Sequence, residues 1–182
     1  MLTRLLFLCV TVVSLNFAQA REFKGVTMPD EIKVGESSLK LNGMGIRKAM
    51  SIFDVYVAGL YVATPSKDAD EILKATTPKK LVMHFKRFVE KSKLKDAWQE
   101  GFEKNADKEY SFRTDMLKLN DQMSHVQAND EITYTFFPDH ADIVVKDKPV
   151  LTIQGAEFSK TLLKVFIGNP PDQDLKKGLL GE

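Results

Sequence analysis

Residues 39–63 read LKLNGMGIRKAMSIFDVYVAGLYVA, and this stretch decides the fold. Its β-branched and aromatic side chains predict two strands joined by a turn. Alternate residues of the second strand form two faces, one with Phe53, Val55, Val57 and Tyr61 and the other with Tyr56, Ala58, Leu60 and Val62. Both faces are largely apolar, which indicates a central strand that is covered on both sides.

Strand and helix patterns also follow one another through the rest of the chain. We expect a short helix that ends near Lys74, a strand over residues 79–88, a helix with Ser92 as its N-cap, helical structure over residues 110–123, strands over residues 131–137, 143–145 and 150–153, a helix that begins at Gly155, and a short terminal helix. This order predicts an α+β fold with a large, mostly antiparallel sheet. No linker or repeat divides the chain, so we expect a single domain over residues 21–182.

The first 20 residues have the pattern of an export signal. Arg4 supplies a positive charge, an apolar stretch follows over residues 5–15, and Ala18-Gln19-Ala20 is a small-x-small cleavage site. The apolar stretch is shorter than the about 20 residues that a membrane-spanning helix needs, so cleavage is favoured over an uncleaved anchor. We therefore expect residues 1–20 to be removed and the protein to be periplasmic or secreted.

Composition argues against several classes of protein. The 182 residues include 26 basic and 25 acidic ones, and this balance argues against a nucleic-acid partner, whose phosphates require clustered cations. No apolar run after residue 20 is long enough to span a membrane. The only cysteine, Cys9, lies in the predicted signal, which excludes a disulfide framework. A monomer is the favoured state.

Common catalytic motifs are missing from the sequence. There is no glycine-rich phosphate loop and no G-x-S-x-G motif. His84, His125 and His140 are scattered along the chain, without the spacing of a metal site. We therefore expect neither a metal nor a cofactor, and we assign no catalytic residue.

Arg47 is the unusual residue of the predicted hairpin. It lies in an otherwise apolar strand, and Tyr56 lies on the strand that pairs with it. A half-buried guanidinium is costly unless an anion pairs with it. A carboxylate or an enolate oxygen fits its planar donors, and a nearby phenol can add a hydrogen bond. Alternatively, Arg47 extends to the sheet edge or pairs with an internal acid such as Asp54.

Several motifs together resemble the chalcone isomerase-like superfamily, and most closely its bacterial exported branch. The matching runs are GMGIR at 43–47, VYVAGLY at 55–61, TPKKLVMHF at 77–85, LKDAWQEGF at 94–102, IQGAEFSKTLLKVFIGNPP at 153–171 and the terminal LKKGLLG. They cover nearly all of the chain after the predicted signal. The resemblance implies an open-faced β-sandwich, in which a layer of helices covers one face of the large sheet and a ligand cleft lies between them.

The resemblance also implies a set of ligand contacts. Arg47 matches an arginine that faces an oxyanion or a carboxylate, and Tyr56 matches a position where the enzymes have threonine and fatty-acid binders have tyrosine. Ser159 matches a serine or threonine that contacts substrate in the enzymes. These three residues are therefore the expected ligand-binding residues. The enzymes also have a tyrosine and, seven residues later, an asparagine on one helix, and residues 92–104 contain neither.

Three functions remain open. The favoured one is a non-catalytic binder of a fatty acid or a similar anionic amphiphile. The second is an isomerase of the intramolecular lyase type, in which an arginine stabilises a developing enolate or phenolate. The third is a structural or interaction module whose cleft is closed by its own side chains.

Overall fold

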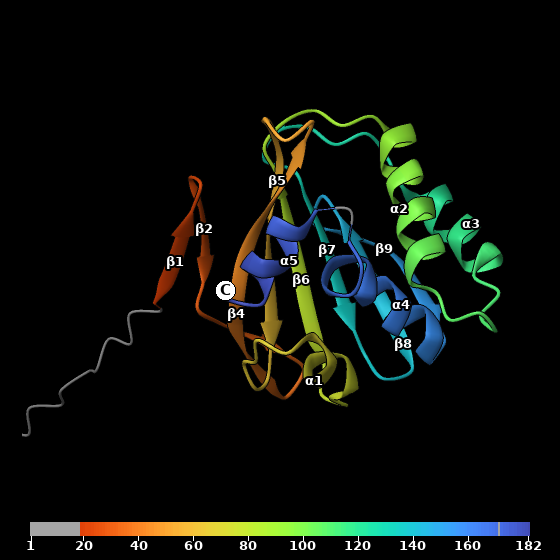
Figure 1. Cartoon of the computed structure of the whole chain (residues 1–182), viewed down its shortest axis with the longest axis horizontal. Helices are drawn as coiled ribbons and strands as arrows, with labels where there is room; N and C mark the ends of the chain where they lie inside the picture. The colour runs from red at the N-terminus through yellow and green to blue at the C-terminus, as the bar shows by residue number, and fades with distance from the viewer. Residues whose placement is uncertain (1–18, 171) are drawn as a thin grey trace, which may run out of the picture.

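The computed structural model describes residues 19–170 and 172–182. The proposed signal therefore lies almost wholly outside the described residues, and its prediction stands as made. Within the described ranges the chain forms nine strands and five helices. Figure 1 shows the helices gathered in front of one large sheet.

The large sheet is a meander in which each strand pairs antiparallel with the next one along the chain. Its strands, in spatial order, are β3 (Glu31–Val34), β4 (Ser37–Ala49), β5 (Phe53–Val62), β6 (Lys79–Phe85), β7 (Glu131–Phe136), β8 (His140–Val145) and β9 (Lys148–Gln154). A separate two-stranded hairpin is formed by β1 (Ala20–Phe23) and β2 (Val26–Pro29).

The helical layer packs on one face of this sheet (Figure 1). It consists of α1 (Ala69–Lys74), α2 (Lys91–Asn105), α3 (Arg113–Gln122), α4 (Ala156–Ile167) and α5 (Gln173–Leu179). The main core lies between the two layers, where Trp98 of α2 and Phe166 of α4 pack on Tyr134 of β7. Burial of such aromatic and aliphatic surface is the main force that holds helices to the sheet.

From Val57 to Val62 both faces of β5 are buried, as the sequence pattern predicts, whereas Phe53 at the start of the strand is exposed. Ala58, Leu60 and Val62 belong to the core under the helices. Val57 and Tyr61 face the other way, into a second cluster that includes Val26 and Met28 of β2 together with residues of β4. The small hairpin thus covers part of the face that the helices leave open.

The predicted α+β fold, a large antiparallel sheet with a helical layer on one face, is confirmed. Several boundaries differ from the prediction. The expected N-cap at Ser92 is wrong, because α2 already begins at Lys91 after an N-cap at Glu90. The strand predicted to residue 88 ends at Phe85. The short strands β1, β2 and β3 went unpredicted, because each has four residues and buries at most one face.

Helix α5 lies unusually close to β4, and glycines make this possible. A side-chain carbon at Gly43 would clash with the carbonyl oxygen of Gly178, and one at Gly45 would clash with the carbonyl oxygen of Leu175. The bulged residue Asn42 fastens the far end of the helix, because its amide nitrogen donates to the carbonyl oxygen of Leu179 at 2.8 Å. The absence of side chains therefore lets helix backbone rest directly on strand backbone.

We predict that Gly45→Ala destabilises the protein by about 3 kcal/mol, because the added methyl group meets rigid helix backbone rather than a movable side chain. Gly35→Ala is the matched control. Its site has open space around it, and only the left-handed φ of +56° opposes the substitution, at a cost of about 1 kcal/mol. Urea denaturation of both variants measures the difference, and equal losses would contradict the close approach of α5 to β4.

Candidate ligand-binding site

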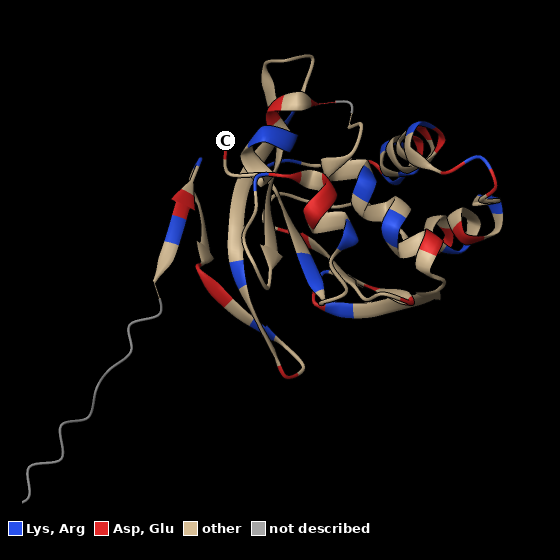
Figure 2. Cartoon of the chain, turned by 60° about the horizontal axis from the view of Figure 1, so that its bottom comes forward, with Lys and Arg blue, Asp and Glu red and all other residues tan. Residues whose placement is uncertain are grey.

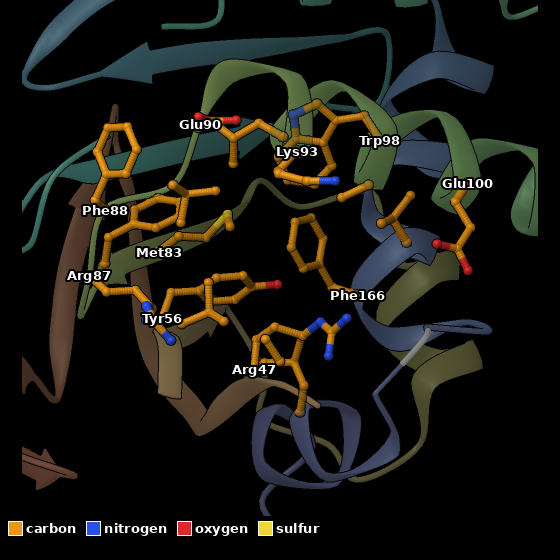
Figure 3. A pocket seen from close by; sticks show the side chains of 18 residues that line it. Arg47, Tyr56, Met83, Arg87, Phe88, Glu90, Lys93, Trp98, Glu100 and Phe166 are labelled. Atoms are coloured by element: carbon orange, nitrogen blue, oxygen red, sulfur yellow. The ribbon is translucent and has the colours of Figure 1, made fainter. Parts of the chain in front are cut away.

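Arg47 and Tyr56 lie directly opposite each other on β4 and β5. On β4, Arg47 follows Gly43 and Gly45 on the face that carries α5, so its side chain emerges just beyond the first turn of that helix. Figure 3 shows its guanidinium group and the hydroxyl group of Tyr56 converging on one space. The pairing predicted from the sequence is therefore present in the sheet.

Asp172, the N-cap of α5, is the acid that contacts Arg47. Its Oδ2 atom lies 3.4 Å from Nη1 of Arg47 and accepts the backbone N–H of Lys48 at 3.0 Å. Its Oδ1 atom accepts the backbone N–H groups of Asp174 and Leu175. Asp54, the acid suggested from the sequence, makes no ion pair with Arg47. Asp172 thus has three backbone donors besides Arg47.

Much of the guanidinium group of Arg47 is left for another partner. Its Nη1 atom donates to the carbonyl oxygen of Lys48 and to Asp172, and no residue within 19–170 and 172–182 accepts a hydrogen bond from Nη2 or Nε. The side chain is 32% exposed, whereas that of Asp172 is 13% exposed. Arginine has five N–H donors in a planar fork, so the remaining donors can bind both oxygens of a carboxylate.

Tyr56 presents a neutral phenol next to this cation. Its ring packs on Phe85 at 5.5 Å between centroids, and its hydroxyl group has no hydrogen-bond partner among the described residues. Burial raises the pKa of Tyr56 well above its ordinary value, although the positive charge of Arg47 opposes the rise. The phenol therefore keeps its proton at neutral pH and can donate it to an anion.

A cavity of about 590 Å³ opens in front of these two side chains, between β4, β5 and β6 on one side and α2, α4 and α5 on the other. Its buried wall is apolar and consists of Met83, Phe85, Leu94, Trp98, Val165, Phe166 and Leu175. Its exposed lining residues, which we call the rim, are Arg87, Phe88, Glu90, Lys93, Ala97 and Glu100. Figure 3 shows Arg47 and Tyr56 across this cavity from Lys93 and Trp98 of α2.

Two polar groups lie at or behind the apolar wall without a partner. The indole nitrogen of Trp98 and the hydroxyl group of Tyr134 are buried, and neither forms a hydrogen bond to a described residue. The two rings meet edge to face at 5.6 Å, and Trp98 lines the cavity. An unpaired buried donor costs about 1 to 3 kcal/mol, so the core retains capacity for polar contact at this place.

Ser159, the third residue suggested by the resemblance, lies elsewhere. It occupies the first turn of α4, whereas Val165 and Phe166 of the same helix line the cavity near its end. Its hydroxyl group donates to the carbonyl oxygen of Phe137 at 2.8 Å and borders a separate pocket of about 190 Å³. The structure therefore brings Arg47 and Tyr56 together and does not bring Ser159 to them.

The sequence analysis overlooked Asn105, because it considered only residues 92–104 of the helix that is α2. Helix α2 includes Asn105, which lies seven residues after Trp98. Its amide nitrogen donates to the carbonyl oxygens of Gly101 and Asn169, and its side-chain oxygen accepts the backbone N–H of Asn169. Asn105 thus ties α2 to the segment after α4 and is not among the residues that line the cavity.

The histidines have local partners. His84 lies 3.1 Å from Glu131, His140 lies 2.7 Å from Asp139, and His125 stacks on Phe88. In the described ranges, no group of three histidine, cysteine or acidic residues could hold a metal ion. None of the helices described there is long and apolar enough to cross a membrane.

Comparison with known proteins agrees with this architecture. A family model described as chalcone isomerase-like matches residues 20–181. The chain belongs to the chalcone isomerase-like family. The crystal structure of a fatty-acid binding protein from Arabidopsis thaliana is similar, with a TM-score of 0.71 and 16% sequence identity over 89% of this chain and 96% of that chain. This likeness concerns the fold, and a search of curated proteins gives no match.

We predict that the folded protein keeps its tyrosines protonated in alkaline solution. Burial raises the pKa of all four tyrosines, and that of Tyr61 to about 12. In the unfolded chain these phenols lose their protons near pH ~10. Below pH ~10 these phenols therefore leave the free energy of unfolding unchanged. As the pH rises further they lower it, because only the unfolded state releases their protons there. Near-ultraviolet absorbance measures phenolate, and its appearance in folded protein at pH ~10 would contradict the burial of these groups.

Proposed function

We propose that this protein binds a fatty acid or a similar anionic amphiphile in the cavity between the sheet and the helices. One observation carries the proposal: a half-buried arginine and a neutral, partly buried phenol, directly opposite each other on two strands, face a cavity with an apolar wall. A polar end and an apolar wall match a molecule that has a charged head and a hydrocarbon tail. The printed name of the similar Arabidopsis protein, a fatty-acid binding protein, supports the same class of ligand.

Arg47 and Tyr56 are the proposed head-group ligands. A carboxylate can accept two N–H bonds from the free side of the Arg47 guanidinium and one bond from the Tyr56 hydroxyl. Asp172 does not prevent this, because its contact with Nη1 is long, at 3.4 Å, and its charge is shared by three backbone N–H groups. Glu100 of the rim does not compete either, since Lys104 pairs with it at 2.6 Å.

The apolar wall is the proposed site of the tail. A volume of about 590 Å³ falls within the range of about 300 to 1,000 Å³ that is usual for small-molecule pockets. Each methylene group that leaves water for this wall contributes about 0.8 kcal/mol. A single hydrocarbon chain therefore provides most of the binding energy, and the head group fixes its direction.

Binding is proposed rather than ring closure because of what α2 presents to the cavity. The side chains that it contributes to the wall are Leu94 and Trp98, and Asn105 is held by backbone groups outside the cavity. A ring-closing enzyme needs polar groups that stabilise the developing charge, and each one contributes about 2.7 to 4 kcal/mol. Among the described residues, the part of the buried wall that α2 contributes has no charged or hydroxyl side chain. Stabilisation of the developing charge would therefore depend on Arg47 and Tyr56.

We also propose that the protein is exported and that residues 1–20 are its signal. The pattern of a charge, an apolar stretch and a small-x-small site supports this proposal. The family match begins at Ala20, the last residue of the proposed signal. Removal of the segment leaves Arg21 at the start of β1, where it pairs with Asp30 at 3.4 Å.

We predict that Arg47→Ala weakens binding of a long-chain fatty acid by about 2 to 5 kcal/mol, because the carboxylate loses its cation. Tyr56→Phe removes one hydrogen bond and keeps the ring, so it should weaken binding by about 0.5 to 1.5 kcal/mol. Isothermal titration calorimetry with each variant measures both losses. Neither variant should lose much stability, since Asp172 retains its three backbone donors when Arg47 is removed.

The matched control is Arg113→Ala, which removes an exposed arginine at the start of α3. It lowers the net charge by the same amount as Arg47→Ala and does not touch the cavity, so it should leave binding unchanged. Equal affinities of wild type, Arg47→Ala and Arg113→Ala would remove Arg47 from the site. No binding by wild type would reject the proposed function.

For export, the predicted mature chain begins with Arg21-Glu22. Intact-mass measurement of protein from the periplasm or the culture medium of producing bacteria tests this directly. A product that still carries Met1 and sediments with membranes would show that residues 1–20 act as an anchor. Ala18→Leu is a useful control, because a large residue in the small-x-small site should block cleavage.

A further inference from the structure

The tip of the β4–β5 hairpin exposes large apolar side chains. Met50 is 83% exposed and Ile52 is 71% exposed, and Phe53, the first residue of β5, is 45% exposed. Figure 2 shows this tip protruding at the top of the view without a charged residue. Among the described residues nothing covers Met50 or Ile52. Exposed apolar groups that gather at one point usually mark a contact with a partner or a membrane.

The turn at this tip is built from residues that do not favour it. Met50 and Ser51 have φ angles of 51° and 60°, and the backbone N–H of Ile52 donates to the carbonyl oxygen of Ala49 at 3.3 Å. Asn-Gly is the preferred pair in such a turn, because a residue with a longer side chain is strained in the left-handed region. The sequence thus accepts local strain and keeps apolar side chains where polar ones would be more stable. Departures of this kind are typical of functional positions.

The chain segments next to the tip are rich in cations. The two neighbouring segments, residues 48–54 and 86–93, carry five of them, Lys48, Lys86, Arg87, Lys91 and Lys93, against the two acids Asp54 and Glu90, so their net charge is +3. None of the five forms an ion pair with a described residue, although the ammonium groups of Lys86 and Lys91 donate to the carbonyl oxygens of Lys24 and Asp121. Two acids, Asp172, which Arg47 holds, and Asp174, line a shallow pocket together with Met50 and Ser51. In a chain whose basic and acidic residues nearly balance, this local excess is a distinct feature.

The tip adjoins the rim of the cavity. The guanidinium group of Arg87 lies over the ring of Phe53 at 5.1 Å, and Arg87 is itself a rim residue. Its neighbour Phe88 also belongs to the rim and is 49% exposed. Ala49, the residue before the turn, lines the cavity as well. Whatever contacts the tip therefore also contacts the entrance to the cavity.

We propose that this end of the molecule docks on the surface of a membrane that contains anionic phospholipids. Met50 and Ile52 insert among the lipid headgroups, and the cations of residues 48–54 and 86–93 bind lipid phosphates. The shape favours a membrane over a protein partner, since two side chains on a narrow, protruding turn insert into a soft layer but offer little area to a rigid surface. Passage of an amphiphile between bilayer and cavity rests on the proposed function, whereas docking itself does not.

The test variant replaces the tip by Met50→Asn, Ser51→Gly and Ile52→Thr. It removes the apolar side chains and places the preferred pair in the turn, so its melting temperature should equal or exceed that of wild type. Its partition onto vesicles of phosphatidylcholine and phosphatidylglycerol, measured by sedimentation, should fall by about tenfold or more. Leu117→Thr removes an apolar side chain that is 58% exposed on α3 and should leave partition unchanged.

Charge is tested with a second pair of variants. Lys48→Gln with Lys86→Gln should weaken partition by about 30-fold, since each lysine near an anionic surface contributes about 1 kcal/mol. Lys33→Gln with Lys40→Gln, at the other end of β4, should have no effect. Vesicles of phosphatidylcholine alone, or added salt, should reduce binding of wild type.

Equal partition of wild type and the tip variant would overturn the proposal, and so would equal losses in the tip variant and Leu117→Thr. Self-association of wild type that the tip variant abolishes, without vesicle binding by either, would assign the tip to a second copy of the chain and reject membrane docking. Titration of a fluorescent fatty acid without vesicles keeps the two proposals apart. The tip variant should bind it like wild type, and the vesicle assays need no fatty acid.

Discussion

Contact between the backbones of α5 and β4 positions the candidate site. Gly43 and Gly45 on the strand and Gly178 on the helix leave no side chain between the two segments. The backbone of the helix therefore packs directly on the backbone of the strand. Its N-cap, Asp172, then lies beside Arg47, the next residue on the same face of β4. The location of the arginine, its acid neighbour and the adjoining wall residue Leu175 all follow from this one approach.

The fold tolerates Arg47 because an acid lies next to its charge, while most of its N–H donors stay free. A guanidinium group with no partner in this half-buried position would destabilise the fold, and one that was saturated by acids could not bind a ligand. Asp172 provides a partial counter-charge. It contacts one nitrogen of the Arg47 guanidinium, and its carboxylate also accepts three backbone N–H groups. Tyr56 supplies a proton donor on the paired strand without adding a charge.

Local patterns predicted most of the fold. The two-faced apolar pattern of residues 53–62 identified a central strand, and the predicted hairpin put Arg47 and Tyr56 on paired strands. The register that sets them directly opposite each other came from the structure. Asp172 could not be found in this way, because its pairing with Arg47 spans 125 residues of sequence. Ser159 was selected only by its spacing in a resembling family, and spacing along a helix does not say which pocket a side chain borders.

The order of the strands in the sheet has a consequence for folding. Neighbouring strands of the meander are also neighbours in the chain, so the sheet can grow by local steps from its first strand to its last. Helix α5 breaks this pattern, since it is the last element and returns across the whole sheet to β4, with a contact between Asn42 and Leu179 that spans 137 residues. Closing so long a loop comes late. The part of the cavity wall that Leu175 provides is therefore completed late in folding, after the neighbouring strands of the meander have paired.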